Sequence, residues 1–185
     1  MDSSISEAIS LELAGSNSEN HYNFALNGHT FTYDGADKSS EISNLNILTD
    51  VKGSGITIKN QQFTVSNTNF TGSTSIKNDI SAITNNGGDL YISNSAFTKN
   101  SSGLTSGAIN NTGNGSLRIS DSLISENYGF NGGAFYQNNG NTVITNTKIS
   151  DNTASRFGGA IYVNDGSLNI KDSDVSDNST DAYGG

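Results

Sequence analysis

A repeat of about 26 residues is the feature that most constrains how this chain can fold. Four alanines, Ala82, Ala108, Ala134 and Ala160, stand at equal intervals along the chain, and the last three occur in similar phrases. Those phrases are Gly107-Ala108-Ile109, Gly132-Gly133-Ala134-Phe135 and Gly158-Gly159-Ala160-Ile161. A fixed period between about 20 and 50 residues indicates a solenoid, a propeller or another repeat architecture.

A second block lies between these phrases and has the pattern of a β-strand. Its copies cover residues 90–97, 117–124, 142–149 and 168–175. Leu90 and Ile92 are separated by one residue, so they face one side of a strand and Tyr91 faces the other. The first side stays apolar in nearly every copy, whereas the second side holds unrelated residues, namely Tyr91, Arg118, Val143 and Asn169. This contrast predicts a buried interior and a variable, solvent-facing exterior.

Few architectures combine a period of this length with short strands and no helical pattern. A leucine-rich repeat needs several leucines per unit, and a propeller blade needs roughly 40 residues. We therefore predict an all-β chain that forms a right-handed parallel β-helix of five to seven coils. Stacking would bring equivalent residues into internal ladders, one of Ile92, Ile119, Ile144 and Ile170 and one of Phe97, Ile124, Ile149 and Val175.

Two further series recur with the coils and are interpreted as structural. An asparagine follows each closing apolar residue at the third position, giving Asn100, Asn127, Asn152 and Asn178. We expect these residues to form a turn ladder, because asparagine tolerates left-handed backbone geometry and its amide can bond from coil to coil. We expect Gly133, Gly159 and Gly185 to serve the other corner in the same way.

The pattern weakens towards the N-terminus. We assign residues 1–34 to an N-terminal cap and an irregular first coil, and residues 35–185 to the β-helix, with the regular repeat from about residue 53. Residues 1–20 are expected to cover one end of the solenoid through Ile5, Ile9, Leu11 and Leu13, with either a short helix or a strand near Ser4. Because the last residues stop where the repeat would next place an alanine, we expect a longer natural chain.

Composition and charge exclude several classes of partner. The net charge is −9, and only nine Lys and Arg residues are scattered along the chain, so no basic stripe exists for nucleic acid or anionic lipid. No stretch approaches the length of an apolar membrane span, which predicts no direct membrane insertion by this segment. There is no cysteine, so disulfides and thiolate chemistry are absent.

The residues show no catalytic constellation, although parallel β-helices also host polysaccharide lyases and hydrolases. Such enzymes need a base beside neutralising cations, or two or three convergent carboxylates. Arg118 and Arg156 stand in different parts of the repeat. The best carboxylate cluster is Asp172, Asp174 and Asp177, with Asp121 two coils from Asp172, and we interpret these residues as solvated turn positions. His21 and His29 are interpreted as ordinary surface or cap residues.

These observations predict that the chain is not an enzyme, has no catalytic residues and needs no cofactor or metal. Calcium at Asp172, Asp174 and Asp177 is the alternative, because oxygen-rich turns suit this ion. Ice binding is a further alternative, but the outward row that it would need reads Ser93, Ser120, Thr145 and Lys171 and is interrupted by the lysine.

The pairing of a GGA[ILV] phrase with an FxxN phrase resembles a known family. The phrases are Gly158-Gly159-Ala160-Ile161 and Phe97-Thr98-Lys99-Asn100. They resemble the polymorphic outer membrane protein repeats of chlamydial autotransporters, and are similar to adhesin-like repeat proteins of methanogenic archaea and bacteria. The resemblance covers about residues 53–185. The chain departs from it where isoleucine or valine replaces the phenylalanine, at Ile124, Ile149 and Val175, and where Ser106 replaces the first glycine.

The resemblance implies a surface-displayed passenger or stalk, with the repeat motif as a structural element that some proteins use in adhesion. The motif residues here are Phe97, Asn100, Asn127, Gly132, Gly133, Ala134, Asn152, Gly158, Gly159, Ala160, Ile161 and Asn178. We expect an exported, cell-surface adhesin segment whose targeting segment is not in this sequence, and whose partner is a protein or glycan of a host or neighbouring cell. The alternatives are a polysaccharide lyase or hydrolase, a tailspike-like carbohydrate-binding protein and a purely structural spacer.

Any binding surface should then lie on an outward strand face or a row of turns. Aromatic residues are favoured at interfaces, which makes Tyr91, Tyr128, Tyr136 and Tyr162 the candidate contacts. The alternative for Tyr136 and Tyr162, which are one repeat apart, is that they occupy equivalent places and stack on each other.

Overall fold

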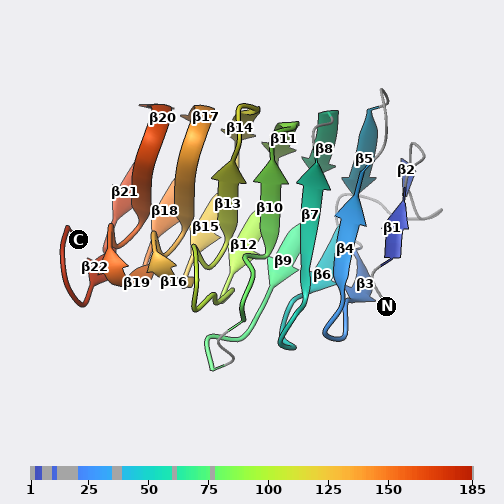
Figure 1. Cartoon of the computed structure of the whole chain (residues 1–185), viewed down its shortest axis with the longest axis horizontal. Helices are drawn as coiled ribbons and strands as arrows, with labels where there is room; N and C mark the ends of the chain where they lie inside the picture. The colour runs from blue at the N-terminus through green and yellow to red at the C-terminus, as the bar shows by residue number, and fades with distance from the viewer. Residues whose placement is uncertain are drawn as a thin grey trace.

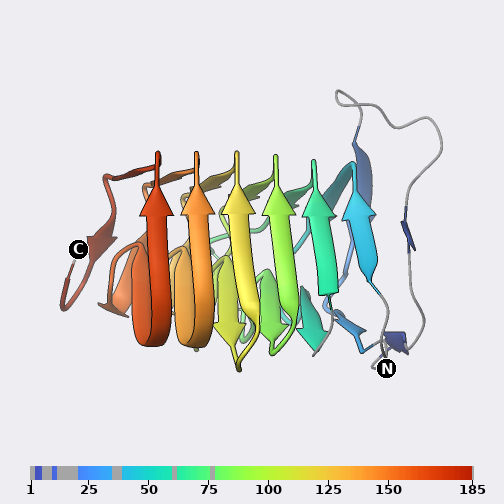
Figure 2. The same ribbon diagram turned by 90° about the horizontal axis from the view of Figure 1, so that it is seen from above.

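The protein is a parallel β-solenoid of about six turns, as predicted. The computed structural model describes residues 3–5, 10–11, 21–34, 39–59, 62–75 and 78–184. Within these residues every paired strand runs parallel to its neighbour, and the coils follow one another along a single axis (Figures 1 and 2). No helix in the described residues is long and apolar enough to cross a membrane.

Each coil contributes strands to three sides of the solenoid, and the last coils add a short fourth row. The first side consists of β1 (Ser3–Ile5), β4 (Thr30–Tyr33), β7 (Gly55–Lys59), β10 (Ile83–Asn86), β13 (Ile109–Thr112) and the first parts of β17 (Phe135–Thr145) and β20 (Ile161–Lys171). The second side consists of β2 (Ser10–Leu11), β5 (Ser40–Ser43), β8 (Gln62–Ser66), β11 (Asp89–Ser93), β14 (Ser116–Ser120) and the remainders of β17 and β20.

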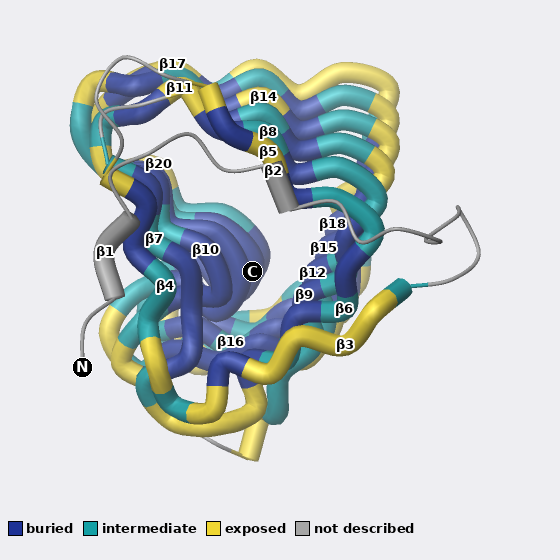
Figure 3. The backbone as a smooth tube through the Cα atoms, turned by 90° about the vertical axis from the view of Figure 1, so that its right-hand side faces the viewer, coloured by how far each residue is buried: buried dark blue, intermediate teal, exposed yellow. Residues whose placement is uncertain are grey.

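The third side and the fourth row complete the coil. The third side consists of β3 (Tyr22–Ala25), β6 (Leu45–Leu48), β9 (Asn69–Thr71), β12 (Ala96–Thr98), β15 (Leu123–Ser125), β18 (Lys148–Ser150) and β21 (Asp174–Ser176). The fourth row consists of β16 (Tyr128–Asn131), β19 (Thr153–Phe157) and β22 (Ser179–Thr180). Viewed from the N-terminal end, the chain passes clockwise from β4 through β5 to β6 as it recedes, so the solenoid is right-handed (Figure 3).

The register of the strands confirms the repeat and shows where it varies. On the second side, successive coils place Ile42, Val65, Ile92, Ile119, Ile144 and Ile170 opposite one another. The spacing of these partners along the chain is unequal, and it is shortest between Ile42 and Val65. The strands stay aligned because the turns absorb these differences, and turns tolerate small changes in length at low cost.

The predicted internal ladders are present. Ile92, Ile119 and Ile144 are at most 2% exposed, and the Phe97 ring lies flat on Phe70 with centroids 4.5 Å apart. Ile170 and Val175 hold their expected places in register but are 36% and 45% exposed. They belong to the last described coil, so each is covered by a neighbouring rung on one side only.

The N-terminal coils join the same sheets. β1 pairs with β4 and β2 with β5, so the segment near Ser4 is a strand and not a helix. Residues 23–33, expected to form an irregular first coil, lie mostly in β3 and β4, which pair in register with β6 and β7. The expected capping contacts of Ile5, Ile9, Leu11 and Leu13 lie outside the residues whose side chains the structure describes.

Candidate functional site

The asparagine series forms a ladder inside the solenoid. Asn127 is 1% exposed, and its Nδ2 donates to the Phe97 carbonyl oxygen and to Asn152 Oδ1, both at 2.9 Å. Its Oδ1 accepts hydrogen bonds from Asn100 N at 2.9 Å and from Asn100 Nδ2 at 3.0 Å. Asn152 bonds to Asn178 in the same way. The expected coil-to-coil bonding of these amides is therefore confirmed.

The left-handed corner position was predicted one residue too late. The residues with positive φ are those that precede the asparagines, namely Lys99, Glu126, Asp151 and Asp177, with φ between 55° and 59°. The asparagine side chain instead turns inward, where its amide holds two neighbouring coils. A similar correction applies at the next corner, where the first glycine of each pair, Gly132 or Gly158, has positive φ (70° and 58°). Gly185, expected to continue this glycine series, lies outside the described residues.

The second glycine of each pair is needed for close packing. A Cβ atom added to Gly133 would lie 2.4 Å from the Gly159 carbonyl oxygen, and one added to Gly159 would lie 2.5 Å from that of Ser179. Ala134, Ala160 and Phe97 are buried, and Ile161 packs partly buried against the core. Most of the motif residues therefore hold the coils together and present little side-chain surface to a partner.

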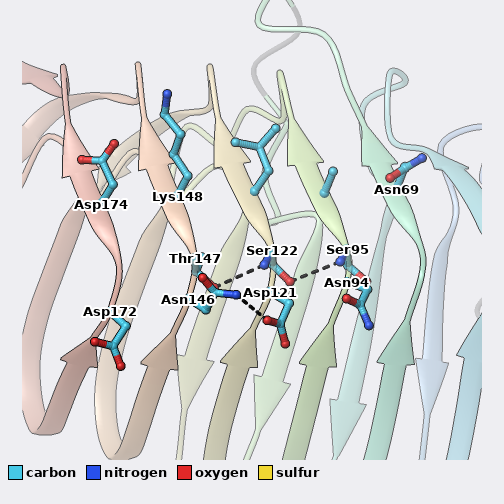
Figure 4. A pocket seen from close by; sticks show the side chains of 12 residues that line it. Asn69, Asn94, Ser95, Asp121, Ser122, Asn146, Thr147, Lys148, Asp172 and Asp174 are labelled. Atoms are coloured by element: carbon cyan, nitrogen blue, oxygen red, sulfur yellow. Dashed lines mark hydrogen bonds between the residues drawn. The ribbon is translucent and has the colours of Figure 1, made fainter.

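A groove of about 620 Å³ follows the corner between the second and third sides (Figure 4). Its lining residues repeat from coil to coil and are mainly amides, hydroxyls and carboxylates: Asn69, Asn94, Ser95, Ala96, Asp121, Ser122, Leu123, Asn146, Thr147, Lys148, Asp172 and Asp174. Asn94, Asp121, Asn146 and Asp172 all have positive φ, between 45° and 52°. The interpretation of Asp121 and Asp172 as turn residues is thus confirmed.

Many polar groups of this groove bond to one another. Asn146 Nδ2 donates to Asp121 Oδ1 at 2.6 Å, and the hydroxyl oxygens of Ser122 and Thr147 accept from backbone N–H groups of the preceding coils (Figure 4). Asp172 and Asp174 line the groove, whereas Asp177 follows β21 at its other end and lines a different cavity. The carboxylate trio that was considered as an alternative calcium or catalytic site therefore does not converge, and no three His, Cys, Asp or Glu residues in the described part of the chain gather around a possible metal position.

The other residues considered for chemistry are also dispersed. Arg118 lies on β14 and Arg156 on β19, in different sheets, as their places in the repeat predicted. His21 Nε2 lies 2.9 Å from the Asn67 carbonyl oxygen, so its ring contacts the backbone two coils further along the solenoid.

Stacked aromatic rings on the outer surface form the most distinctive site. Tyr162 stacks on Tyr136 with centroids 5.8 Å apart and on Phe157 at 5.4 Å, and Phe157 stacks on Tyr183 at 5.8 Å. Phe130 and Arg156 adjoin this stack. We call the six residues Phe130, Tyr136, Arg156, Phe157, Tyr162 and Tyr183 the aromatic face.

Two outward ladders produce the aromatic face. On the first side, successive coils place Thr57, Thr84, Asn110, Tyr136 and Tyr162 in register. On the fourth row, Asn131 of β16 pairs with Phe157 of β19, and Phe157 forms an isolated bridge to Tyr183. Both ladders hold threonine or asparagine in earlier coils and aromatic residues in later ones, so the rings gather near the C-terminal end.

Arg156 is held by two of these rings. Its guanidinium carbon lies 4.7 Å from the centroid of Phe157 and 5.6 Å from that of Phe130, both within the range of a cation–π contact. The three ion pairs found among the described residues are all made by lysines, so none involves this exposed arginine. Partial burial, and next the neighbouring Tyr162, raise the pKa of the Tyr136 phenol above its usual value.

The sequence identified part of this site. Tyr136 and Tyr162 do occupy equivalent places and stack, as the structural alternative predicted. Tyr91 lies on β11, on the second side, and Tyr128 lines a separate cavity with Lys99 and Glu126. Phe130, Arg156, Phe157 and Tyr183 were missed. The spacing of Phe157 and Tyr183 by one repeat was the signal that could have found two of them.

Comparisons with known proteins return no match: no family model, curated protein or solved structure matches this chain.

Proposed function

We propose that this chain is a surface-exposed binding segment of the adhesin or passenger type, which attaches its bearer to a host or neighbouring cell. The aromatic face is the contact surface in this proposal, and the segment performs no catalysis. The observation that carries the proposal is a cluster on the outside of the solenoid, made of four stacked aromatic side chains and one arginine that forms no ion pair with any described residue.

This composition distinguishes the face from ordinary protein surface. Tyrosine, phenylalanine and arginine are enriched at protein interfaces, and tyrosine and arginine are frequent among the residues that dominate binding energy. Apolar side chains scattered singly over a surface need no explanation, whereas a cluster indicates an interaction site. Tyr183, at the end of the stack, is 71% exposed.

The solenoid separates the residues that make the fold from those that could bind. The asparagine ladder and the apolar ladders lie inside, so outward positions can change without disturbing the coils. The FxxN and GGA[ILV] phrases resemble adhesin repeats, and in this chain they provide the scaffold. An exported location at a cell surface, and a protein or glycan partner, are part of the same proposal.

The test is binding of the intact chain to a panel of eukaryotic and bacterial cells and to a glycan array. The test variant carries Tyr136→Ser, Tyr162→Ser and Tyr183→Ser, and the control carries Tyr91→Ser, which removes an outward tyrosine from another side. We expect the triple variant to bind at least about tenfold more weakly, a loss of about 1.4 kcal/mol, and the control to bind normally.

Two results would overturn the proposal. Absence of binding by the intact chain to every cell and glycan would leave a structural spacer. Equal binding by the intact chain and the triple variant would show that the aromatic face is not the contact surface.

A polysaccharide-degrading enzyme is the second candidate, because the groove in Figure 4 carries Asp121, Asp172 and Asp174. Incubation with pectin, alginate and hyaluronan tests it through the release of reducing ends or unsaturated products. We expect none. Turnover that disappears in Asp172→Asn or Asp174→Asn would favour the enzyme.

A further inference from the structure

We propose that the aromatic face binds an acidic saccharide, a sugar bearing a carboxylate, and that Arg156 is its anion-binding residue. This inference rests on the proposed function and names the ligand of the same surface. Four observations support it: the arginine held against two rings, its lack of an ion pair with any described residue, the stacked rings and the polar groups beside them.

The two rings fix the position of the arginine. Phe157 and Phe130 belong to successive coils, and the Arg156 guanidinium carbon lies 4.7 Å and 5.6 Å from their ring centroids. A guanidinium that lies over a ring leaves its N–H groups, which point outward in the plane of the group, free for an acceptor. Because the rings already restrict this long side chain, binding a carboxylate costs less conformational entropy than for a mobile arginine.

Arg156 is the one charged residue of the aromatic face, so this surface suits a ligand that brings a single negative charge. The chain carries a net charge of −9. The three ion pairs found in the described part of the chain, Lys52–Asp79, Lys59–Asp34 and Lys99–Glu126, involve lysines outside the aromatic face. Arg156 keeps its charge uncompensated by any ion pair in the described residues, and it is exposed. A planar carboxylate can accept two parallel hydrogen bonds from such a group. A polyanion such as nucleic acid would need a row of cations, which this acidic surface lacks.

The rings and their surroundings suit a saccharide better than an apolar peptide. The C–H groups on one face of a sugar ring can pack on the aromatic ring at the end of the stack, where Tyr183 is 71% exposed, while the hydroxyl groups around the edge of the sugar need donors and acceptors. Such groups stand on the same strands as the rings. Asn164 Nδ2 donates to Asn138 Oδ1 at 2.8 Å, two positions beyond Tyr162 and Tyr136.

A second polar pair lies on the fourth row. The hydroxyl oxygens of Thr153 and Ser179 are 3.0 Å apart and exposed, on the strand that ends at Phe157 and on its neighbour. The aromatic face therefore has uncharged hydrogen-bonding groups near it on two strand rows. An apolar peptide would leave these groups without new partners, whereas sugar hydroxyls can bond to them.

The experiment compares matched acidic and neutral sugars on the intact chain. The probes are methyl galactopyranosiduronate with its methyl ester, and sialyllactose with lactose, so each acidic probe carries one carboxylate. Binding is measured by calorimetric titration and by ligand-observed NMR. We expect at least one acidic probe to bind at least about tenfold more tightly than its neutral counterpart. Binding should weaken as salt is raised, because the anion contact is exposed.

Three variants locate the anion contact. Arg156→Gln should remove the preference for the acidic probe, and Arg156→Lys should retain only part of it, because lysine keeps the charge but loses the planar fork. Arg118→Gln removes the other arginine, on β14, and should leave binding unchanged. Circular dichroism melts of the three variants establish that each is folded.

The outcomes distinguish this inference from the proposed function. Equal binding of acidic and neutral probes, unchanged binding by Arg156→Gln, or no binding of any sugar would overturn the saccharide assignment. If cell binding were still lost in the triple tyrosine variant, the aromatic face would then contact a protein and the proposed function would stand. If cell binding survived in that variant, the proposed function would fail as well.

Discussion

Removal of one amide from the asparagine ladder tests whether this ladder joins the coils. In Asn127→Ala, four side-chain hydrogen bonds between 2.9 and 3.0 Å are lost. A hydrogen bond contributes about 1 kcal/mol net, and a buried group left without its partner costs about 1–3 kcal/mol. Asn152 Oδ1 still accepts from the Asn127 backbone N–H, and Asn100 Nδ2 still donates to the Phe70 carbonyl oxygen. The Asn100 N–H and the Phe97 carbonyl oxygen lose the side-chain partner that the ladder provided.

These contributions predict a loss of about 3–5 kcal/mol in the free energy of unfolding. For a chain of this size, about 1 kcal/mol corresponds to about 2–4 °C, so the melting temperature should fall by about 6–20 °C. The assay is a thermal or urea melt followed by the circular dichroism of the β-sheet signal.

Asn178→Ala is the matched control. Asn178 makes the same kinds of bond, to Ile149, Ser176 and Asn152, but it is only partly buried because it lies in the last described coil. Water can replace its partners there, so we expect a loss of only about 1 kcal/mol. A melt of Asn127→Ala equal to that of the unmodified chain, or equal losses for the two variants, would refute this account of the ladder.

Two further perturbations test the interior and the surface electrostatics. Ile144→Asp should unfold the adjacent coils, since an unpaired charge would be buried. Ile170→Asp, on the same ladder but at a position that is 36% exposed, should lower the free energy of unfolding far less. Similar thermal melts for the two variants would contradict the interior assignment. Hydrogen bonds from the Ser116 hydroxyl and N–H hold the pKa of Asp89 below its usual value. The resulting stability is present above the unfolded pKa of about 3.9 and is lost as pH falls through the lower folded value. The melting temperature of the unmodified chain, minus that of Asp89→Asn, should therefore decrease between about pH 4 and pH 2, and a difference that does not change with pH would exclude this contribution.

The interior could be predicted because two periods coincide in it. Alternation along a strand identifies which residues face inward, and the longer repeat brings them into register, so Ile92, Ile119 and Ile144 were placed correctly. Ile170 shows the limit of this reasoning. Its register follows from the repeat, but burial of its side chain requires a coil on each side, and only one adjacent coil is described.

The corners could not be predicted residue by residue. Lys99, Glu126, Asp151 and Asp177 share a left-handed backbone and are all charged, but only aspartate is a residue type that often adopts this conformation, so residue type gives a signal at two of the four corners. A left-handed conformation is unfavourable for Lys and Glu. The buried bonds of the asparagine that follows compensate for it, and the sequence shows the asparagine without showing which residue of the pair turns the chain.

The aromatic face was recognised only in part because its two ladders come from different kinds of segment. Tyr136 and Tyr162 lie on strands, where the alternating pattern draws attention to outward residues. Phe157 is the last residue of β19 and Tyr183 forms an isolated bridge, so no alternating pattern draws attention to them. Their proximity to Tyr162 follows from the way the fourth row folds back against the first side, which only the three-dimensional structure shows.

The aromatic face can form because the solenoid places the residues that stabilise it inside and leaves the outward positions free to vary. Each coil needs its inward apolar residues, its asparagine and its close-packed glycines, and these recur in the later coils. The outward ladder of the first side is under no such constraint, since threonine, asparagine and tyrosine all occupy it in register. Aromatic residues at two successive rungs can therefore be accommodated without altering the interior. A single ring on one coil would offer a small contact, but rings on adjacent rungs of two ladders combine into one surface because the coils hold their centroids between 5.4 and 5.8 Å apart.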